Sequence, residues 1–251
     1  MAWEWDAGRY DALNLPHVEW GRRTLARLEL TGTETVLDAA CGTGRDTVAL
    51  LAALPRGRVI AVDASAEMLA RLRSRVAGLG GDAAERLTVV QADLTEPLPV
   101  GEPVDAVFSV AALHWIDDHQ RLFENFAAVL RPGGQLVFDC GGRGNIARVN
   151  AAVQAVLGDV PQVWNFPDAE QTAARLAAAG FTDVETALVE DPARFADLDE
   201  LCDYLETIVL GPHLGRLKPD ERAAFVREIA GRLPDSVIDY VRLTARARRA
   251  G

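Results

Sequence analysis

Short apolar, β-branched runs alternate with helix-like segments over the first 190 residues. The runs have the length of strands, whereas the segments between them repeat apolar residues at helical spacing. The predicted strands are residues 35–39, 58–62, 87–91, 104–110, 135–140, 181–189 and 237–245. The predicted helices are residues 16–30, 45–54, 66–77, 119–130 and 168–179. Near-continuous apolar strands joined by helices are typical of a mostly parallel sheet covered on both faces, so we expect a doubly wound, seven-stranded α/β fold.

The pattern changes after residue 190. A helical block over residues 198–233, interrupted at Gly211-Pro212, separates the last two predicted strands. Such a block between strands is typical of an insertion that closes over a site as a lid. We therefore expect four parts: an N-terminal helical lid segment, an α/β core, a helical insertion over the active site, and the final strand with its tail. Their predicted bounds are 1–33, 34–190, 191–236 and 237–251.

Composition narrows the possible partners and location. The net charge of −11 over 251 residues argues against a nucleic-acid partner, because that attraction needs clustered Lys and Arg. Arg242, Arg246, Arg248 and Arg249 are interpreted as a solvated edge and tail. No apolar run approaches the roughly 20 residues of a membrane span, and the first residues lack the pattern of a signal peptide. Three scattered cysteines fit reduced thiols and no metal site, so we expect a cytoplasmic protein without a membrane partner.

A glycine turn after the first strand carries the strongest chemical signal. The strand reaches Asp38 and turns through Gly42 and Gly44 into a helix, and such a turn lets a ligand lie against bare backbone at the helix N-terminus. Asp63 and Asp93 follow the next two strands. Because ligands bind at the carboxyl ends of strands in open α/β sheets, these positions predict a nucleotide-like cofactor, with Asp63 on a ribose diol.

The residues around the turn argue against a dinucleotide. Thr47 stands where the dinucleotide fingerprint has its third glycine, and Asp38 and Asp46 flank the turn. Carboxylates beside a pyrophosphate would repel it, so a positively charged cofactor without phosphate fits better. For Asp46, stabilisation of the first helical turn is the favoured interpretation.

Several motifs in order resemble the class I S-adenosylmethionine-dependent methyltransferases over residues 34–140. They are Asp38-x-x-x-Gly42-x-Gly44, Asp63, Gln91-Ala92-Asp93 and Leu130-Arg131-Pro132-Gly133-Gly134. Outside this region the chain resembles the trans-aconitate 2-methyltransferase group in Trp5-Asp6 with Tyr10, the Leu113-His114-Trp115 turn and the late helical block. Where that group has a Gln-Trp pair, this chain has His114-Trp115.

The resemblance implies a set of cofactor-binding residues for S-adenosylmethionine. It places Asp38 near the methionine end, Asp63 on the ribose hydroxyls, Asp93 on the adenine amino group and Ser109 beside the transferring methyl. The other residues implied are Ala40, Gly42 and Gly44 in the loop, Ala64, Met68 and Leu94 around the adenine ring, and Tyr10 in the lid.

The expected activity is methyl transfer to a small-molecule acceptor, at a carboxylate or hydroxyl oxygen, with S-adenosylhomocysteine as the product. A carboxylate acceptor needs no base but needs a cation or strong donors, for which Arg143 and His213 are candidates. For a hydroxyl, amine or carbanion acceptor, His114 is the candidate base. His114 and Trp115 are both expected to contact the acceptor.

Two alternatives stay open. A nicotinamide-dependent oxidoreductase could share the sheet and Asp63, but it would need a catalytic Tyr-x-x-x-Lys motif or an equivalent pair. None of Tyr10, Tyr204 and Tyr240 has a lysine four residues later. A non-catalytic or degenerate S-adenosylmethionine-binding protein would keep the cofactor residues and lack an acceptor site.

Overall fold

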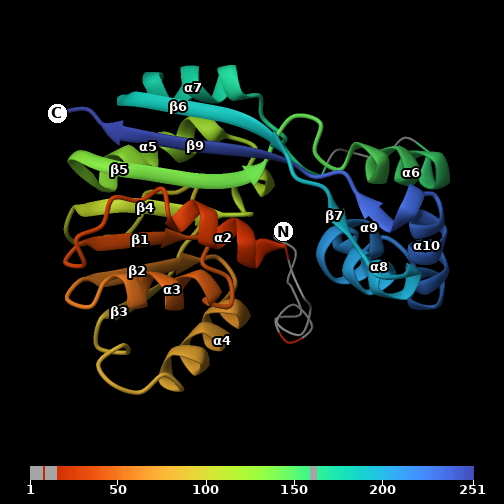
Figure 1. Cartoon of the computed structure of the whole chain (residues 1–251), viewed down its shortest axis with the longest axis horizontal. Helices are drawn as coiled ribbons and strands as arrows, with labels where there is room; N and C mark the ends of the chain where they lie inside the picture. The colour runs from red at the N-terminus through yellow and green to blue at the C-terminus, as the bar shows by residue number, and fades with distance from the viewer. Residues whose placement is uncertain (1–7, 9–15, 159–162) are drawn as a thin grey trace. The chain divides into compact units, whose positions relative to one another are not determined.

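The computed structural model describes residue 8, residues 16–158 and residues 163–251, which form two compact units (Figure 1). The larger unit comprises residues 16–143, 164–189 and 242–251. The smaller unit contains the described residues of 144–163 and 190–241. Within the described part of the chain, no helix has the length and apolar character needed to cross a membrane.

The larger unit is built on a seven-stranded sheet in the order β3-β2-β1-β4-β5-β9-β6 (Figure 1). The strands are β1 (Thr35–Ala39), β2 (Arg58–Asp63), β3 (Leu87–Gln91), β4 (Val104–Val110), β5 (Leu130–Gly141), β6 (Phe181–Glu190) and β9 (Val241–Arg249). The pairs of β1 with β2 and β4, of β2 with β3 and of β4 with β5 are parallel, and β9 runs antiparallel to β5. The doubly wound, mostly parallel sheet is therefore confirmed.

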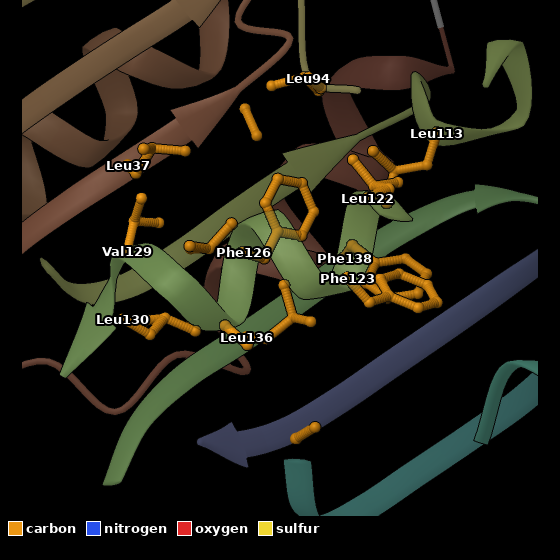
Figure 2. Packing of buried hydrophobic residues seen from close by; sticks show 14 of the residues in the cluster. Leu37, Leu94, Leu113, Leu122, Phe123, Phe126, Val129, Leu130, Leu136 and Phe138 are labelled. Atoms are coloured by element: carbon orange, nitrogen blue, oxygen red, sulfur yellow. The ribbon is translucent and has the colours of Figure 1, made fainter. Parts of the chain in front are cut away.

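The side chains of successive residues along the central strands are buried on opposite faces of the sheet. Leu37 of β1 and Phe138 of β5 belong to one core cluster, whereas Val36 and Val137 belong to another. The first cluster includes residues of α5 (His119–Val129) and α7 (Ala169–Ala178), and Figure 2 shows Phe123 of α5 beside Phe138 of β5. The second packs against α3 (Arg45–Ala53) and α4 (Ala66–Ala77), and α2 (His17–Leu25) contacts β4 and β5. Apolar side chains on both faces explain why the strands read as near-continuous apolar runs.

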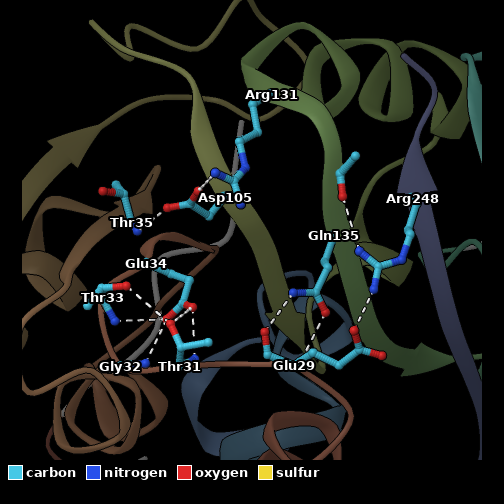
Figure 3. Close-up of polar contacts among 11 residues, drawn as sticks. Glu29, Thr31, Gly32, Thr33, Glu34, Thr35, Asp105, Arg131, Gln135 and Arg248 are labelled. Carbon is cyan, nitrogen blue, oxygen red and sulfur yellow. Dashed lines mark hydrogen bonds and ion pairs between the residues drawn. The ribbon is translucent and has the colours of Figure 1, made fainter.

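A polar network holds the amino-terminal edge of the parallel strands (Figure 3). Asp105 accepts a hydrogen bond from Thr35 N and forms an ion pair with Arg131 at 2.8 Å. Burial opposes ionisation of Glu34, but hydrogen bonds led by that from Thr31 still lower its pKa to about 2. These contacts join β1, β4 and β5 at the edge away from the glycine turn.

The smaller unit is mainly helical. It contains α6 (Ala147–Leu157), α8 (Leu198–Tyr204), a π-helical turn η2 (Leu205–Val209), α9 (Gly211–Leu214), α10 (Pro219–Gly231), and the short strands β7 (Ala193–Arg194) and β8 (Val237–Ile238). The prediction of one strand over 237–245 is wrong, because β8 pairs with β7 while β9 begins at Val241 and joins the large sheet. The sequence pattern does not predict helix α6, whose N-cap is Ile146 in a left-handed conformation, without a capping side chain.

Candidate functional site

The glycine turn between β1 and α3 has a backbone that depends on its glycines. Gly42 and Gly44 have φ angles of +54° and +82°, and Ala40 also has a positive φ of 57°. A Cβ on Gly44 would overlap Cδ1 of Leu72 and lie 2.8 Å from Cγ of the same side chain. A Cβ on Gly42 would meet no atom within 4 Å. Packing therefore requires Gly44, whereas Gly42 faces open space that a ligand could use.

Asp63, the last residue of β2, closes this turn. Its Oδ2 accepts a hydrogen bond from Gly42 N at 2.8 Å, and its Oδ1 accepts one from Ser65 N at 2.9 Å. The half-buried side chain thus fixes the turn at the position where the sequence predicts a ribose.

The expected adenine-binding residues lie around the ends of β2 and β3. Asp93 is exposed, and its Oδ1 accepts hydrogen bonds from N and Oγ1 of Thr95. Ala64 is exposed, whereas Met68 and Leu94 are each 5% exposed and belong to the packed interior. Buried apolar side chains and an exposed carboxylate at these strand ends are the kinds of group that a flat polar ring requires.

Asp38 lies at the buried centre of the site. Its Oδ2 accepts a hydrogen bond from Thr47 Oγ1 at 2.5 Å. Burial, opposed by that hydrogen bond and reinforced by the charges of Asp46 and Asp63, raises the pKa of Asp38 to about 8. Burial likewise raises the pKa of Asp46 to about 6. A nearby cation would favour the ionised form of these two buried carboxyl groups, whereas a pyrophosphate would oppose it, so the residues present fit S-adenosylmethionine.

Asp46 also packs against the first helix of the larger unit. A Cβ on Gly21 of α2 would overlap Oδ1 of Asp46 and lie 2.8 Å from its Cγ. Asp46 stands in the first turn of α3, where the helix dipole favours a negative charge. These contacts support the interpretation of Asp46 as a residue that stabilises the helix.

The end of β4 supplies Ser109 and a strained residue. Ser109 is fully buried, and its Oγ donates a hydrogen bond to the carbonyl oxygen of Ala39 at 2.8 Å. Ala111 follows with a positive φ of 58°. The hydroxyl of Ser109 therefore ties β4 to β1 at the point where both strands reach the site.

His114 is held in one hydrogen-bonding state. It lies in the 3₁₀ turn η1 (Leu113–Trp115) and is 9% exposed. Gly141 N donates to its Nδ1 at 3.2 Å, so a neutral ring carries its proton on Nε2. Burial, followed by the charge of Arg242, holds the pKa of His114 well below its ordinary value. The ring consequently offers an N–H to a ligand, and its acceptor nitrogen is already used, which disfavours the role of a base.

Aromatic rings lie around His114, and part of this cluster is not predicted from the sequence. The ring of Trp115 lies 6.0 Å from that of Trp164, and the ring of Phe166 lies 5.8 Å from that of His114. Asn165 fixes this segment, since its N donates to the His114 carbonyl oxygen at 2.9 Å. The sequence shows Trp164-Asn165-Phe166 only as aromatics in a predicted loop, without the periodicity that would place them.

The remaining candidates are Arg143, His213 and Tyr10. Arg143 has a side chain that is 73% exposed, and it pairs with Asp168 at 2.8 Å. His213 is buried in the smaller unit, where burial and then Arg216 lower its pKa. Tyr10 lies outside the described residues. The interpretation of Arg242 as a solvated residue is wrong, because it is 2% exposed and pairs with buried Asp139.

Comparisons with known proteins agree with this geometry. A model of the methyltransferase domain family matches residues 36–134. A trans-aconitate 2-methyltransferase of Azoarcus sp. (strain BH72) is 36% identical over 132 residues, covering 53% of this chain and 49% of that protein. A malonyl-[acyl-carrier protein] O-methyltransferase of Methylovorus sp. (strain MP688) is 35% identical over 181 residues, covering 70% of this chain and 60% of that protein. The chain thus spans about half the length of the first of these relatives and three fifths of the second.

The fold also resembles solved structures. The YcgJ protein from Bacillus subtilis superposes with a TM-score of 0.68 at 17% identity, covering 94% of this chain and all of that one. At this identity the likeness is one of fold.

Proposed function

We propose that this chain, as a class I S-adenosylmethionine-dependent methyltransferase, transfers a methyl group to a carboxylate or hydroxyl oxygen of a small molecule. The observation that carries this proposal is the connection of Asp63 to the glycine turn through Gly42 N. It brings the second strand's carboxylate next to the open side of Gly42, as a ribose-containing cofactor requires.

Each residue of the proposed cofactor site has a distinct task. Asp63 accepts hydrogen bonds from the ribose hydroxyls, and Asp93 accepts one from the adenine amino group. Asp38 faces the cationic methionine end. The backbone at Ala40, Gly42 and Gly44 leaves room for that end. Ala64, Met68 and Leu94 contact the adenine ring, and Ser109 lies on the side of the methyl group.

The chain's part in the reaction is alignment and exclusion of water. S-adenosylmethionine supplies an already activated methyl group when it is bound. Ordered loops and a buried site can then contribute through orientation alone, for which effective molarities of about 10⁵ M or more are known. The proposed reaction forms a bond from the acceptor oxygen to the methyl carbon, breaks the bond from sulfur to that carbon, and leaves S-adenosylhomocysteine.

A carboxylate oxygen is the favoured acceptor. One relative is named for trans-aconitate and the other for malonyl-[acyl-carrier protein], and both of these compounds carry a free carboxylate. A carboxylate is ionised at neutral pH and needs no base, which agrees with a His114 ring whose Nδ1 is occupied.

The free thiols Cys41, Cys140 and Cys202 support the proposed cytoplasmic location.

Two measurements test the proposal. Titration calorimetry should show binding of S-adenosylmethionine and S-adenosylhomocysteine and no binding of NADH; the reverse result would assign the chain to oxidoreductases. Methyl transfer should then be measured on a panel of small carboxylic acids, phenols and amines. Transfer to at least one carboxylic acid is expected, whereas cofactor binding without transfer to any acceptor would identify a non-catalytic binding protein.

A further inference from the structure

Arg242 is a buried arginine at the edge of the sheet where the candidate site lies. It stands opposite Gly141 in the register of β5 and β9, at the carboxyl end of the parallel strands. Its Nε donates to Oδ1 of Asp139 at 2.8 Å, and its Nη2 donates to the same oxygen. Its Cζ lies 3.8 Å from the centroid of the Trp20 ring. The guanidinium is therefore held in one position from two sides.

Asp139 uses only part of this guanidinium. An arginine side chain has five N–H donors, and the two nitrogens that donate here share one carboxylate oxygen. Within the described residues Nη1 of Arg242 makes no hydrogen bond. This nitrogen is not completely shielded from solvent. Leaving a charged donor without an acceptor is costly in a buried setting. The arrangement thus leaves donors for a group that the described part of the chain does not supply.

His114 places a second donor near the first. Gly141, the partner of Arg242 in the sheet, donates its N–H to Nδ1 of His114, which leaves the proton of the imidazole on Nε2. Nε2 makes no hydrogen bond with any residue that the structure describes. Burial and the nearby charge of Arg242 lower the pKa of His114, and the same two effects, with Arg45, lower that of His17 to about 3. At neutral pH both imidazoles are uncharged, and Arg242 remains a cation beside them.

We propose that Arg242 and the Nε2–H of His114 together bind a carboxylate of the methyl acceptor. This inference rests on the proposed function and assigns the acceptor to the carboxylic acids. A guanidinium matches the planar geometry of a carboxylate, and a neutral imidazole adds a directed hydrogen bond without moving a proton. Phenols and amines would leave these buried donors unsatisfied, so the same residues select against them.

The competing explanation is that Arg242 only ties β9 to β5 through Asp139. Binding of trans-aconitate and of its neutral trimethyl ester should be measured by calorimetry on protein saturated with S-adenosylhomocysteine. The variants are Arg242→Gln and Arg242→Lys. Arg246→Gln is the matched control, since Arg246 lies on the same strand and pairs with Glu29. Thermal denaturation of each variant reports whether it folds.

Arg242→Gln should weaken trans-aconitate binding by about 10- to 100-fold, the range for losing a charge-assisted hydrogen bond. Arg242→Lys should fall in between, Arg246→Gln should match the wild type, and S-adenosylhomocysteine affinity should stay within about twofold throughout. If Arg242→Gln does not fold, Arg242→Lys decides, because it keeps the charge and loses the fork of donors.

Two results would overturn the inference: equal affinity of the wild type for acid and ester, or wild-type affinity for the acid in a folded Arg242 variant. The inference and the proposed function can fail separately. Binding of the acid that depends on Arg242, without methyl transfer to any acceptor, would refute only the function. Transfer to carboxylic acids that is indifferent to Arg242 would refute only the inference.

Discussion

Replacing each glycine of the turn by alanine should separate folding from cofactor binding. At Gly44 the new methyl group meets two penalties. A left-handed φ costs about 1–2 kcal/mol for a residue with a Cβ. Overlap with Leu72, which is fully buried, adds about 1–3 kcal/mol of overpacking. Gly44→Ala should therefore lower the free energy of unfolding by about 2–5 kcal/mol, a large part of the roughly 5–15 kcal/mol usual for a protein.

Gly42→Ala meets only the first penalty, because its Cβ would lie in open space. It should lower the free energy of unfolding by about 1–2 kcal/mol. It should nevertheless weaken S-adenosylhomocysteine binding by at least about tenfold, since the methyl group would occupy the surface against which the cofactor is proposed to lie. Urea denaturation without ligand gives the stabilities, and titration calorimetry gives the affinities.

A double-mutant cycle with Leu72→Ala isolates the clash at Gly44. The cost of Gly44→Ala should shrink by about 1 kcal/mol or more in that background, whereas the cost of Gly42→Ala should not change. The reasoning fails if Gly44→Ala costs no more than Gly42→Ala. It also fails if Gly42→Ala leaves S-adenosylhomocysteine affinity within about twofold of the wild type.

Two further predictions concern ionisation and packing. The raised pKa of Asp38, about 8 against about 3.9 in an unfolded chain, stabilises the ligand-free fold at low pH, and this contribution is lost as pH rises from about 4 to 8. Ionisation of Asp38 beside the cationic cofactor should release about one proton when the cofactor binds at pH 7. Titration calorimetry in buffers of different ionisation enthalpy would detect this proton, because the measured heat would then depend on the buffer. Asp38→Asn should abolish the proton release. In α5, Phe126→Ala should lower the free energy of unfolding by about 3–5 kcal/mol in urea denaturation, because Phe126 is fully buried. Replacement of the exposed residue in Glu124→Ala should change this free energy by no more than about 0.5 kcal/mol. Equal effects of the two substitutions would contradict the packing shown in Figure 2.

The parts of the fold that follow local rules could be predicted from the sequence. The strand ending at Ala39 and the helix beginning at Arg45 lie where apolar runs and the glycine turn place them. The carboxyl ends of parallel strands share one edge, which is why the order of strands and turns along the chain is enough to expect Asp38, Asp63 and Asp93 near one another.

The proposed acceptor side depends on contacts between distant segments, which the sequence does not encode locally. Arg242 looks like its neighbours in an arginine-rich tail, and only its pairing with Asp139, 103 residues earlier, buries it. His114 looks like a base until Gly141 is seen to occupy its Nδ1. Trp164 and Phe166 join the site because Asn165 binds the backbone of the His114 turn.

The hydrogen bond from Gly42 N to Asp63 has a consequence for the thermodynamics of ligand capture. Because this hydrogen bond lies within the chain, the protein's own residues hold the shape of the turn, and less conformational entropy is left to be lost when a ligand arrives. Binding by such a preorganised loop is limited by encounter and desolvation, not by a slow rearrangement of the backbone. The amides of residues 40–44 are thus expected to exchange their hydrogens nearly as slowly in the free protein as in the complex.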